Sequence, residues 1–209
     1  MTPSEYPKIQ YISQGDTLAI QSRNIRLALD AGADWIQIRW KQPKDTAFRD
    51  FCTSIKKHCA SYQALCLLND HVDTARAIDA DGVHLGLTDM PVSDARALLG
   101  TNKIIGGTAN TAADILQRME ERCDYIGLGP WRYTTTKKQL SPILGLEGFT
   151  EIMTYLQQLD RPAPPIYAIG GIRLEDIPTL QQIGIHGIAV STLLTEQPRQ
   201  ITSIKSILQ

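Results

Sequence analysis

Short apolar segments alternate with longer amphipathic segments over almost the whole chain. Brief apolar runs bounded by Gly, Pro, Asp or Asn predict strands at Ile9–Ser13, Trp35–Arg39, Leu65–Asn69, Gly82–Leu85, Ile104–Thr108, Tyr125–Leu128, Ile166–Ile169 and Gly187–Val190. Segments whose apolar residues recur every three or four positions predict helices at Asn24–Ala31, Thr46–Ser61, Val72–Ile78, Val92–Leu99, Ala112–Glu121, Leu146–Gln158, Leu174–Ile183 and Arg199–Leu208. Each predicted strand is therefore followed by one predicted helix.

This alternation favours a parallel sheet, because parallel neighbours need a crossover connection that a helix usually supplies. Eight repeats in 209 residues give about 26 residues for each, close to a minimal strand–helix unit. We therefore expect an α/β protein, a (β/α)₈ TIM barrel formed by a single domain over residues 1–209. A doubly wound open sheet is the alternative. The sequence argues against the dinucleotide-binding version of that open sheet, because no Gly-x-Gly-x-x-Gly follows the first strand.

Composition narrows the functional classes. Hydrophobic residues make up 43% and charged residues 21%, as in ordinary globular domains, and the net charge of −1 argues against a nucleic-acid partner. The sequence has neither an apolar run of membrane-spanning length nor a signal-like start, so we expect a cytoplasmic protein with no membrane association. The cysteines form no Cys-x-x-Cys pair, and we expect buried apolar thiols rather than metal ligands or disulfides at Cys52, Cys59, Cys66 and Cys123.

Charged and polar side chains gather where the predicted strands end, which is where barrel enzymes do their chemistry. Gln37, Arg39 and Lys41 alternate with Ile38 and Trp40, so all three polar residues face one side of the second strand. If that side is the barrel interior, two cations converge on the barrel mouth. Burying them there is costly unless an anion meets them, although a strand end that extends its charges into solvent is the alternative.

Two carboxylates follow neighbouring strands. Asp70 comes after Asn69 at the end of the third strand, and Asp89 shortly follows the fourth strand, which contains His84. Carboxylate oxygens on adjacent loops suit Mg²⁺, which takes one or two carboxylates together with substrate phosphate oxygens and water. Taken singly, each Asp is better explained as a helix N-cap, and metal binding becomes competitive for the pair beside Arg39 and Lys41. His84 is either a satisfied core group or a contact for a bound ring.

Glycines and hydroxyls follow the last strands. Gly170-Gly171 after the seventh strand and Ser191-Thr192 after the eighth match the usual barrel phosphate site, which is built from backbone N–H groups. After the fifth strand, Thr108 and Asn110 either line a pocket or cap the next helix.

The segment that leaves the sixth strand is rich in hydroxyls. It runs from Asp124 through Gly-Leu-Gly-Pro to a cluster that ends in Lys137 and includes Thr134 and Thr136. These side chains offer donors and a positive charge to a phosphate or diphosphate, and a solvated loop is the alternative reading.

These motifs occur together in one order: Gln-x-Arg-x-Lys, Leu-x-Asn-Asp, Asp-Gly-Val-His-Leu-Gly-x-x-Asp, Asp-Tyr-Ile-Gly-x-Gly-Pro…Thr-x-Thr-Lys, Ala-Ile-Gly-Gly-Ile and Gly-Ile-Ala-Val-Ser. From about Tyr11 to Thr192 the chain resembles the thiamine-phosphate synthase family, which includes the thiazole tautomerases. The resemblance implies a (β/α)₈ barrel that uses Mg²⁺. It implies a transferase that joins a hydroxymethylpyrimidine diphosphate to a thiazole phosphate, releasing diphosphate and, from the carboxylated thiazole, CO₂.

The resemblance also assigns roles. It implies that the catalytic cations Arg39, Lys41 and Lys137, with Asn69, hold the diphosphate, and that Asp70 and Asp89 bind Mg²⁺. The pyrimidine would be bordered by Gln37, His84 and Thr108, and the thiazole phosphate would be held by Thr134, Thr136, Gly171, Ser191 and Thr192. Partners are then small molecules, and the sequence leaves the oligomeric state open, a homo-oligomer included.

Two positions depart from the commoner family pattern. Leu87 stands where many members carry glutamine, and Asn110 stands where many carry histidine. The tautomerase branch relies on that histidine for proton transfer, and an asparagine cannot serve as an acid or base. The complete diphosphate set favours the synthase over the tautomerase. It also argues against a non-catalytic barrel that binds a phosphate ligand.

Overall fold

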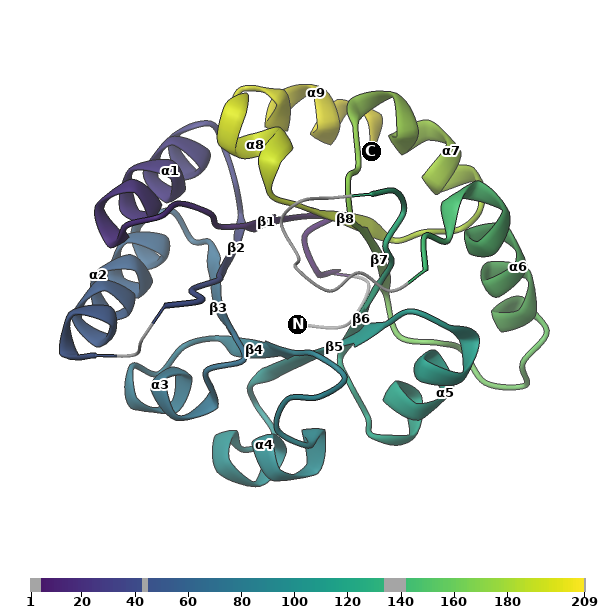
Figure 1. Ribbon diagram of the computed structural model, residues 1–209, viewed down its shortest axis with the longest axis horizontal. Coiled ribbons are helices and arrows are strands. Elements are labelled where there is room, and N and C mark those ends of the chain that lie inside the picture. Colours follow the sequence, from purple (N-terminus) through teal and green to yellow (C-terminus); the bar gives the residue numbers. More distant parts are fainter. Residues whose placement is uncertain (1–4, 43–44, 134–141, 209) are drawn as a thin grey trace.

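The chain forms a closed barrel of eight parallel strands in the computed structural model, which describes residues 5–42, 45–133 and 142–208 (Figure 1). Each strand pairs with its sequence neighbours, and the barrel closes where β1 pairs with β8, with Tyr11 opposite Val190. Closure confirms the predicted (β/α)₈ barrel over the open sheet. The strands are β1 (Ile9–Ile12), β2 (Trp35–Ile38), β3 (Leu65–Asn69), β4 (Gly82–Leu85), β5 (Ile104–Ala109), β6 (Tyr125–Leu128), β7 (Ile166–Ile169) and β8 (Gly187–Val190).

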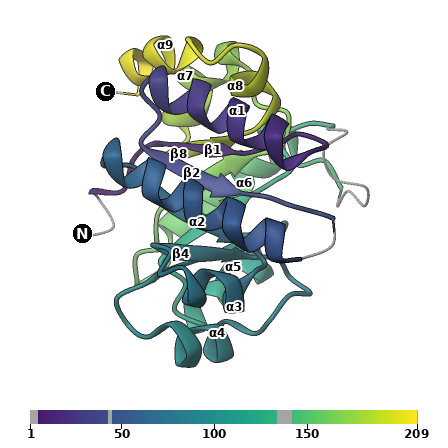
Figure 2. The same ribbon diagram turned by 90° about the vertical axis from the view of Figure 1, so that its left-hand side faces the viewer.

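The helices surround the barrel on its outside (Figures 1 and 2). They are α1 (Leu18–Asp30), α2 (Thr46–Ser61), α3 (Val72–Ala77), α4 (Val92–Leu99), α5 (Ala112–Glu120), α6 (Gly145–Gln157), the 3₁₀ turn η2 (Leu174–Asp176), α7 (Ile177–Gln182), α8 (Thr192–Glu196) and α9 (Gln200–Ile207). No helix in the described ranges is long and apolar enough to cross a membrane.

Strand alternation sorts the core into two layers. Side chains that face outward pack beneath the helices and form the larger apolar cluster, which includes Ile36, Val83 and Ile126. Side chains that face inward fill the barrel with a smaller cluster made of Tyr6, Ile12, Trp35, Leu67, Tyr125, Tyr167 and Ala189. The barrel interior is therefore a packed core, as in other barrels of this size, and any cavity must lie above it.

Aromatic rings hold the inner layer together. The Trp35 ring centroid lies 4.9 Å from that of Tyr125 and 5.3 Å from that of Tyr167, both in edge-to-face geometry. The hydroxyl of Tyr167 donates a hydrogen bond to the backbone oxygen of Pro7 over 2.8 Å. Tyr167 is thus anchored at the chain entry to β1, on the side of the inner layer that precedes the strands.

The cysteines behave as predicted. All four thiols are free and buried, and burial raises the pKa of Cys52 and of Cys123 to about 12. Such thiols stay protonated and act as small apolar side chains.

The structure differs from the predicted helices in three places: one start, one helix type and one additional helix. The first helix begins at Leu18, not Asn24, because the Thr17 hydroxyl accepts a hydrogen bond from the Ile20 N–H and caps it. The predicted helix at Leu174–Ile183 begins with a turn of 3₁₀ helix before α7. The segment after β8 holds α8 in addition to α9, because the chain turns into a helix immediately after Ser191. Other boundaries agree within one residue.

Candidate active site

A cavity of about 470 Å³ opens above the inner core, where the strands end. Its wall contains every predicted site residue that the structure describes, namely Gln37, Arg39, Lys41, Asn69, Asp70, His84, Asp89, Thr108, Gly171, Ser191 and Thr192. The remaining predicted residues, Thr134, Thr136 and Lys137, lie outside the described residues. Side chains from six strand ends thus meet around one space, as the barrel topology requires.

The cationic wall follows β2. The backbone of Arg39 is fixed on both sides, since its N–H donates to the Ser13 hydroxyl over 3.1 Å and its carbonyl accepts from the Gln21 amide over 3.0 Å. Burial lowers the pKa of Arg39, while the neighbouring Asp70 carboxylate opposes that shift. A guanidinium held beside Lys41 in a partly buried wall is suited to meet an anion.

The acidic wall follows β3 and β4. Asp70 adopts a left-handed backbone with φ of 65°, and its N–H donates to the His84 carbonyl over 3.0 Å. Asp89 accepts a hydrogen bond at Oδ2 from the Gly86 N–H over 2.6 Å. A left-handed non-glycine residue stores strain that the surrounding structure must maintain, and such strain concentrates at functional sites.

The two carboxyls interact directly. Burial, the hydrogen bond with Asp89 and the charge of Asp89 raise the pKa of Asp70 to about 7. Burial acts to raise the pKa of Asp89 as well, but hydrogen bonds from Asp70 and Gly86 outweigh it and lower that pKa. With no cation between them, the pair therefore holds one proton below about pH 7, and Asp70 carries it.

This pair fits a magnesium ion. Two neighbouring carboxyl groups supply hard oxygen donors at one point, and Mg²⁺ ordinarily completes its shell with water and phosphate oxygens. The described part of the chain has no cluster of three or more His, Cys, Asp or Glu residues that could hold a metal alone. The alternative reading of Asp70 as a helix N-cap was wrong, because α3 has His71 at that position.

The cavity floor is a hydrogen-bonded chain of buried polar side chains. His84 contacts the Tyr125 hydroxyl through Nδ1 at 2.9 Å and the Thr108 hydroxyl through Nε2 at 3.0 Å. The Gln10 amide donates to the same Tyr125 hydroxyl over 3.0 Å, and the Gln37 amide donates to Gln10 Oε1 over 3.0 Å. Sequence analysis missed Gln10 and Tyr125, whose only sequence signal is a polar atom at an inward-facing position of a strand.

The opposite wall is made of glycine turns and hydroxyls. Gly170 and Gly171 have φ of 97° and 67°, and a Cβ on Gly171 would lie 2.5 Å from Cγ of Arg132. Arg132 clamps this turn, since its guanidinium pairs with both oxygens of Asp176 at 2.5 and 2.8 Å and donates to the Gly171 carbonyl over 2.9 Å. The turn is therefore fixed with its backbone open toward the cavity.

Hydroxyls complete that wall. Ser191 donates to Oε1 of Gln14 over 2.9 Å, and Thr192 lies 3.5 Å from the same oxygen. Gln14 follows β1 and was not singled out from the sequence. It ties the end of β1 to the residues after β8 across the line where the barrel closes.

Thr108, near the end of β5, and Asn110, directly after it, line the cavity rather than cap the next helix. Thr111 caps α5 in a reciprocal capping box with Asp114. The Thr108 hydroxyl instead contacts Nε2 of His84, and the Asn110 side-chain amide donates a hydrogen bond to the Gly129 carbonyl. Of the two alternatives that the sequence left open for Thr108 and Asn110, the pocket-lining one is confirmed.

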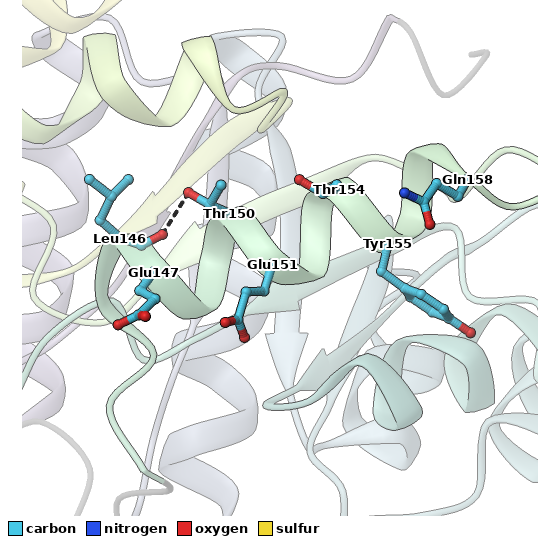
Figure 3. Close-up of a pocket in the computed structure, with 7 residues that line it drawn as sticks. All are labelled: Leu146, Glu147, Thr150, Glu151, Thr154, Tyr155 and Gln158. Atoms are coloured by element: carbon cyan, nitrogen blue, oxygen red, sulfur yellow. Dashed lines mark hydrogen bonds between the residues drawn. The ribbon is translucent and has the colours of Figure 1, made fainter.

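A larger hollow of about 710 Å³ lies outside the barrel along α6 (Figure 3). Its lining is one helix face of mixed character: Leu146, Glu147, Thr150, Glu151, Thr154, Tyr155 and Gln158. The Thr150 hydroxyl there bonds only its own helix, donating to the Leu146 carbonyl over 2.8 Å. Two like-charged carboxylates, with no cation among the described residues of the lining, make this surface a poor site for phosphate chemistry.

The chain matches one family of proteins over most of its length. The model of the thiamine monophosphate synthase family matches residues 12–194. A thiamine-phosphate synthase of Flavobacterium johnsoniae is 50% identical over 202 residues, which cover 97% of this chain and 95% of the relative. A thiamine-phosphate synthase of Bacteroides thetaiotaomicron is 42% identical over 207 residues, which cover 96% and 99%.

A solved structure agrees with these sequence relatives. Thiamine phosphate pyrophosphorylase from Pyrococcus furiosus superposes with a TM-score of 0.80 at 28% identity, over 97% of each chain. The similarity therefore covers all eight strand ends that surround the cavity.

Proposed function

The chain belongs to the thiamine monophosphate synthase family and is a transferase of thiamine biosynthesis, and on this premise we propose how its cavity performs the transfer. The substrates are the diphosphate of 4-amino-2-methyl-5-hydroxymethylpyrimidine and a thiazole phosphate or its carboxylate. The pyrimidine methylene carbon loses its bond to the diphosphate oxygen, which leaves with the electron pair. The thiazole nitrogen then supplies the pair for the new C–N bond. With the carboxylated thiazole, the bond to the carboxyl carbon also breaks, CO₂ leaves, and the electron pair left on the ring carbon takes a proton.

The diphosphate lies against the wall that follows β2, β3 and β4. Arg39 and Lys41 meet its charge, and Asn69 adds a donor at the end of β3. Lys137, outside the described residues, adds a third cation from the segment after β6. Cations placed where negative charge develops lower the barrier most, because the charge on the leaving oxygen grows as the C–O bond breaks.

Asp70 and Asp89, which line the same side of the cavity, would hold Mg²⁺. The ion supplies Lewis-acid stabilisation of the departing diphosphate when it is bound. The raised pKa of Asp70 supports this role, because a carboxylate pair that keeps a proton in the metal-free protein is a pair suited to a divalent cation. Arg39 opposes the proton on Asp70 and so keeps the pair ready to ionise.

The thiazole phosphate occupies the opposite wall. Gly171 offers its backbone, and Ser191 and Thr192 offer hydroxyls and N–H groups at the end of β8. Thr134 and Thr136, outside the described residues, would contact the thiazole from the segment after β6. Because β2 to β4 and β7 to β8 lie on different arcs of the barrel, the two anions are held apart and the reacting atoms meet between them.

The pyrimidine ring lies on the cavity floor between Gln37, His84 and Thr108. Its amino group can stabilise a cation at the methylene carbon, so departure of diphosphate precedes attack. The protein then excludes water from that cation and aligns the thiazole nitrogen with it.

The observation that carries the proposal is the convergence of the cationic pair Arg39 and Lys41, the carboxylate pair Asp70 and Asp89, and the glycine–hydroxyl wall on one cavity. The test is diphosphate release when both substrates and Mg²⁺ are present, compared with each omitted in turn. Asp89→Ala is expected to lower turnover about a hundredfold or more. Asp73→Ala, an exposed carboxylate in the first turn of α3, is the matched control and is expected to retain full activity. Full activity in Asp89→Ala would contradict the metal assignment.

We also propose the cytoplasm as the working compartment. All four cysteines are free and buried, which suits a reducing environment.

A further inference from the structure

Two buried residues that the proposed reaction does not use lie directly beneath the cavity. Gln10 is 1% exposed and Tyr125 is fully buried, and neither lines the cavity wall. Both nevertheless contact residues that do, since Gln10 accepts from Gln37 and Tyr125 contacts His84. The five side chains Gln37, Gln10, Tyr125, His84 and Thr108, which we call the floor relay, thus join one side of the cavity to the other.

The floor relay depends on a glycine, Gly106, in the strand between His84 and Tyr125. Gly106 of β5 stands in register with His84 on one side and with Tyr125 on the other. A Cβ at Gly106 would lie 2.1 Å from Cζ of the Tyr125 ring. Because Gly106 has no side chain to fill that space, the Tyr125 hydroxyl on β6 and the His84 ring on β4 form a hydrogen bond across β5, although β4 and β6 do not pair.

In a hydrogen-bonded chain of this kind, the donors can all point in one direction along the chain or all in the other. The reason is that each hydroxyl and each neutral imidazole has only one proton to donate. Gln10 and Gln37 both approach the Tyr125 oxygen as donors. The phenol proton is then left for Nδ1 of His84. His84 accordingly carries its own proton on Nε2 and donates it to the Thr108 hydroxyl oxygen.

The Tyr125 proton is always available for this purpose. Burial raises the pKa of Tyr125 well above its usual 10.0, although the hydrogen bonds from Gln10 and Gln37 oppose the shift. The hydroxyl therefore stays neutral at any pH at which the protein works. The sense of the relay is set by the two amides, and Gln10, Gln37 and Tyr125, which decide it, are each 1% exposed or less.

We propose that Gln10 and Tyr125 are positioning residues that fix the hydrogen-bonding sense of the cavity floor, so that Gln37 presents an acceptor and Thr108 a donor to the bound ring. This pattern complements a ring with an exocyclic amino group and unprotonated ring nitrogens. It is mismatched to the oxo counterpart, whose exocyclic oxygen accepts and whose neighbouring ring nitrogen donates. The inference rests on the proposed function for the identity of the ring.

The variant that tests the relay is Tyr125→Phe. It removes the shared hydroxyl and keeps the ring that packs against Trp35 and Tyr167. Tyr167→Phe is the matched control, because it removes a hydroxyl from the same aromatic cluster whose partner is the Pro7 carbonyl, remote from the relay. Gln10→Met is a second relay variant of similar length without hydrogen-bonding atoms.

The first measurement is the ratio of kcat/KM for the aminopyrimidine diphosphate to that for its oxo counterpart. Tyr125→Phe and Gln10→Met are each expected to narrow this ratio about tenfold, and to leave the KM for thiazole phosphate unchanged. Their double variant is expected to narrow it little further, because both changes interrupt one chain. Tyr167→Phe is expected to keep the wild-type ratio. An unchanged ratio in folded Tyr125→Phe overturns the proposal.

The second measurement does not depend on the reaction. The chain has four histidines, so ¹⁵N-resolved NMR of the imidazole rings can isolate His84, with His84→Gln identifying its signal. We expect the Nε2–H tautomer in the wild type and in Tyr167→Phe, and loss of that single tautomer in Tyr125→Phe. An Nδ1–H tautomer in the wild type overturns the relay sense. A wild type that forms no thiamine phosphate would instead refute the proposed function, while the NMR result still decides the relay.

Discussion

The hydroxyl of Tyr125 and Nδ1 of His84 lie 2.9 Å apart, although the residues are 41 positions apart in sequence and stand on strands that do not pair. Through this contact, the fully buried core residue Tyr125 hydrogen-bonds the imidazole of His84, which lines the cavity. In this barrel the packed interior and the active site are therefore one hydrogen-bonded system. The predictions below concern the cavity that this system supports.

The first prediction concerns magnesium binding as a function of pH. Asp70 must lose its proton before the carboxylate pair can hold the ion, and its pKa in the metal-free protein is about 7. Mg²⁺ affinity, measured by calorimetry on the protein alone, is expected to fall as pH drops below about 7. In Asp70→Asn the pH dependence is expected to disappear together with most of the binding. Equal affinity at pH 5.5 and 8 in the wild type would argue against this pair as the metal site.

The same pKa has a consequence for stability. A carboxyl whose folded-state pKa is raised binds more protons in the folded than in the unfolded state, so metal-free stability falls as pH rises from about 4 to about 7. Asp70→Asn is expected to remove this loss and to stabilise the metal-free protein at pH 8 by about 1–2 kcal/mol, a value reduced for solvent screening.

Asp89→Asn is the matched comparison for that stability effect. The pKa of Asp89 is lowered, so its ionised form contributes stability above its unfolded-state pKa, and that contribution is lost as pH falls through the folded-state value. Asp89→Asn is therefore expected to destabilise the protein below about pH 7, where Asp70 still carries the proton that it donates to Asp89. Thermal melts in the presence of a chelator measure both variants, and shifts of the same sign in the two would show that the proton is not shared as inferred.

The third prediction separates the two branches of the family. Asn110 has no titratable proton, and its amide is engaged with the Gly129 carbonyl. We expect clear condensation activity and negligible isomerisation of the thiazole carboxylate. Following that carboxylate by NMR with the pyrimidine omitted is the measurement. Asn110→His is expected to gain some isomerisation, whereas isomerisation by the wild type would reverse the assignment.

The fourth prediction concerns the glycine wall. A Cβ on Gly171 would meet Arg132 at 2.5 Å, and its φ of 67° disfavours any side chain. Gly171→Ala is expected to cost about 1–3 kcal/mol of stability and to raise the KM for thiazole phosphate. Gly100→Ala is the control, because Gly100 also has a positive φ, of 83°, but has no atom within 4 Å of its Cβ position. A raised KM in both variants would point to backbone strain alone rather than to the cavity wall.

The fifth prediction separates leaving-group binding from acceptor binding. Lys137, outside the described residues, is expected to act mainly as the C–O bond breaks, so Lys137→Ala should slow single-turnover chemistry more than it weakens substrate binding. Ser191→Asp should instead raise the KM for thiazole phosphate through like-charge repulsion and spare diphosphate binding. If Lys137→Ala weakened only thiazole phosphate binding, the two anion sites would have to be exchanged.

The sequence alone determined the alternation of eight strands with helices and many of the polar residues of the cavity wall, because both are encoded by local patterns. A strand of four residues such as Gly82–Leu85 is recognisable from its apolar run, and the residue after its end necessarily faces the mouth of a parallel barrel. Arg39, Asp70 and Ser191 were predicted for this reason and Asp89 from the loop after β4, and the structure places each of them at the cavity.

Tertiary structure decided what no local pattern encodes. Whether the sheet closes depends on the pairing of β1 with β8, which are separated by most of the chain. The capping alternative for Asp70 was eliminated only when the backbone placed His71 at the helix start. The roles of Gln10 and Tyr125 arise from a contact between residues 115 positions apart, in a space that Gly106 leaves open on a third strand. Hydrogen-bond partners are set by position in space, so polar residues inside a strand reveal their role only once the barrel has closed.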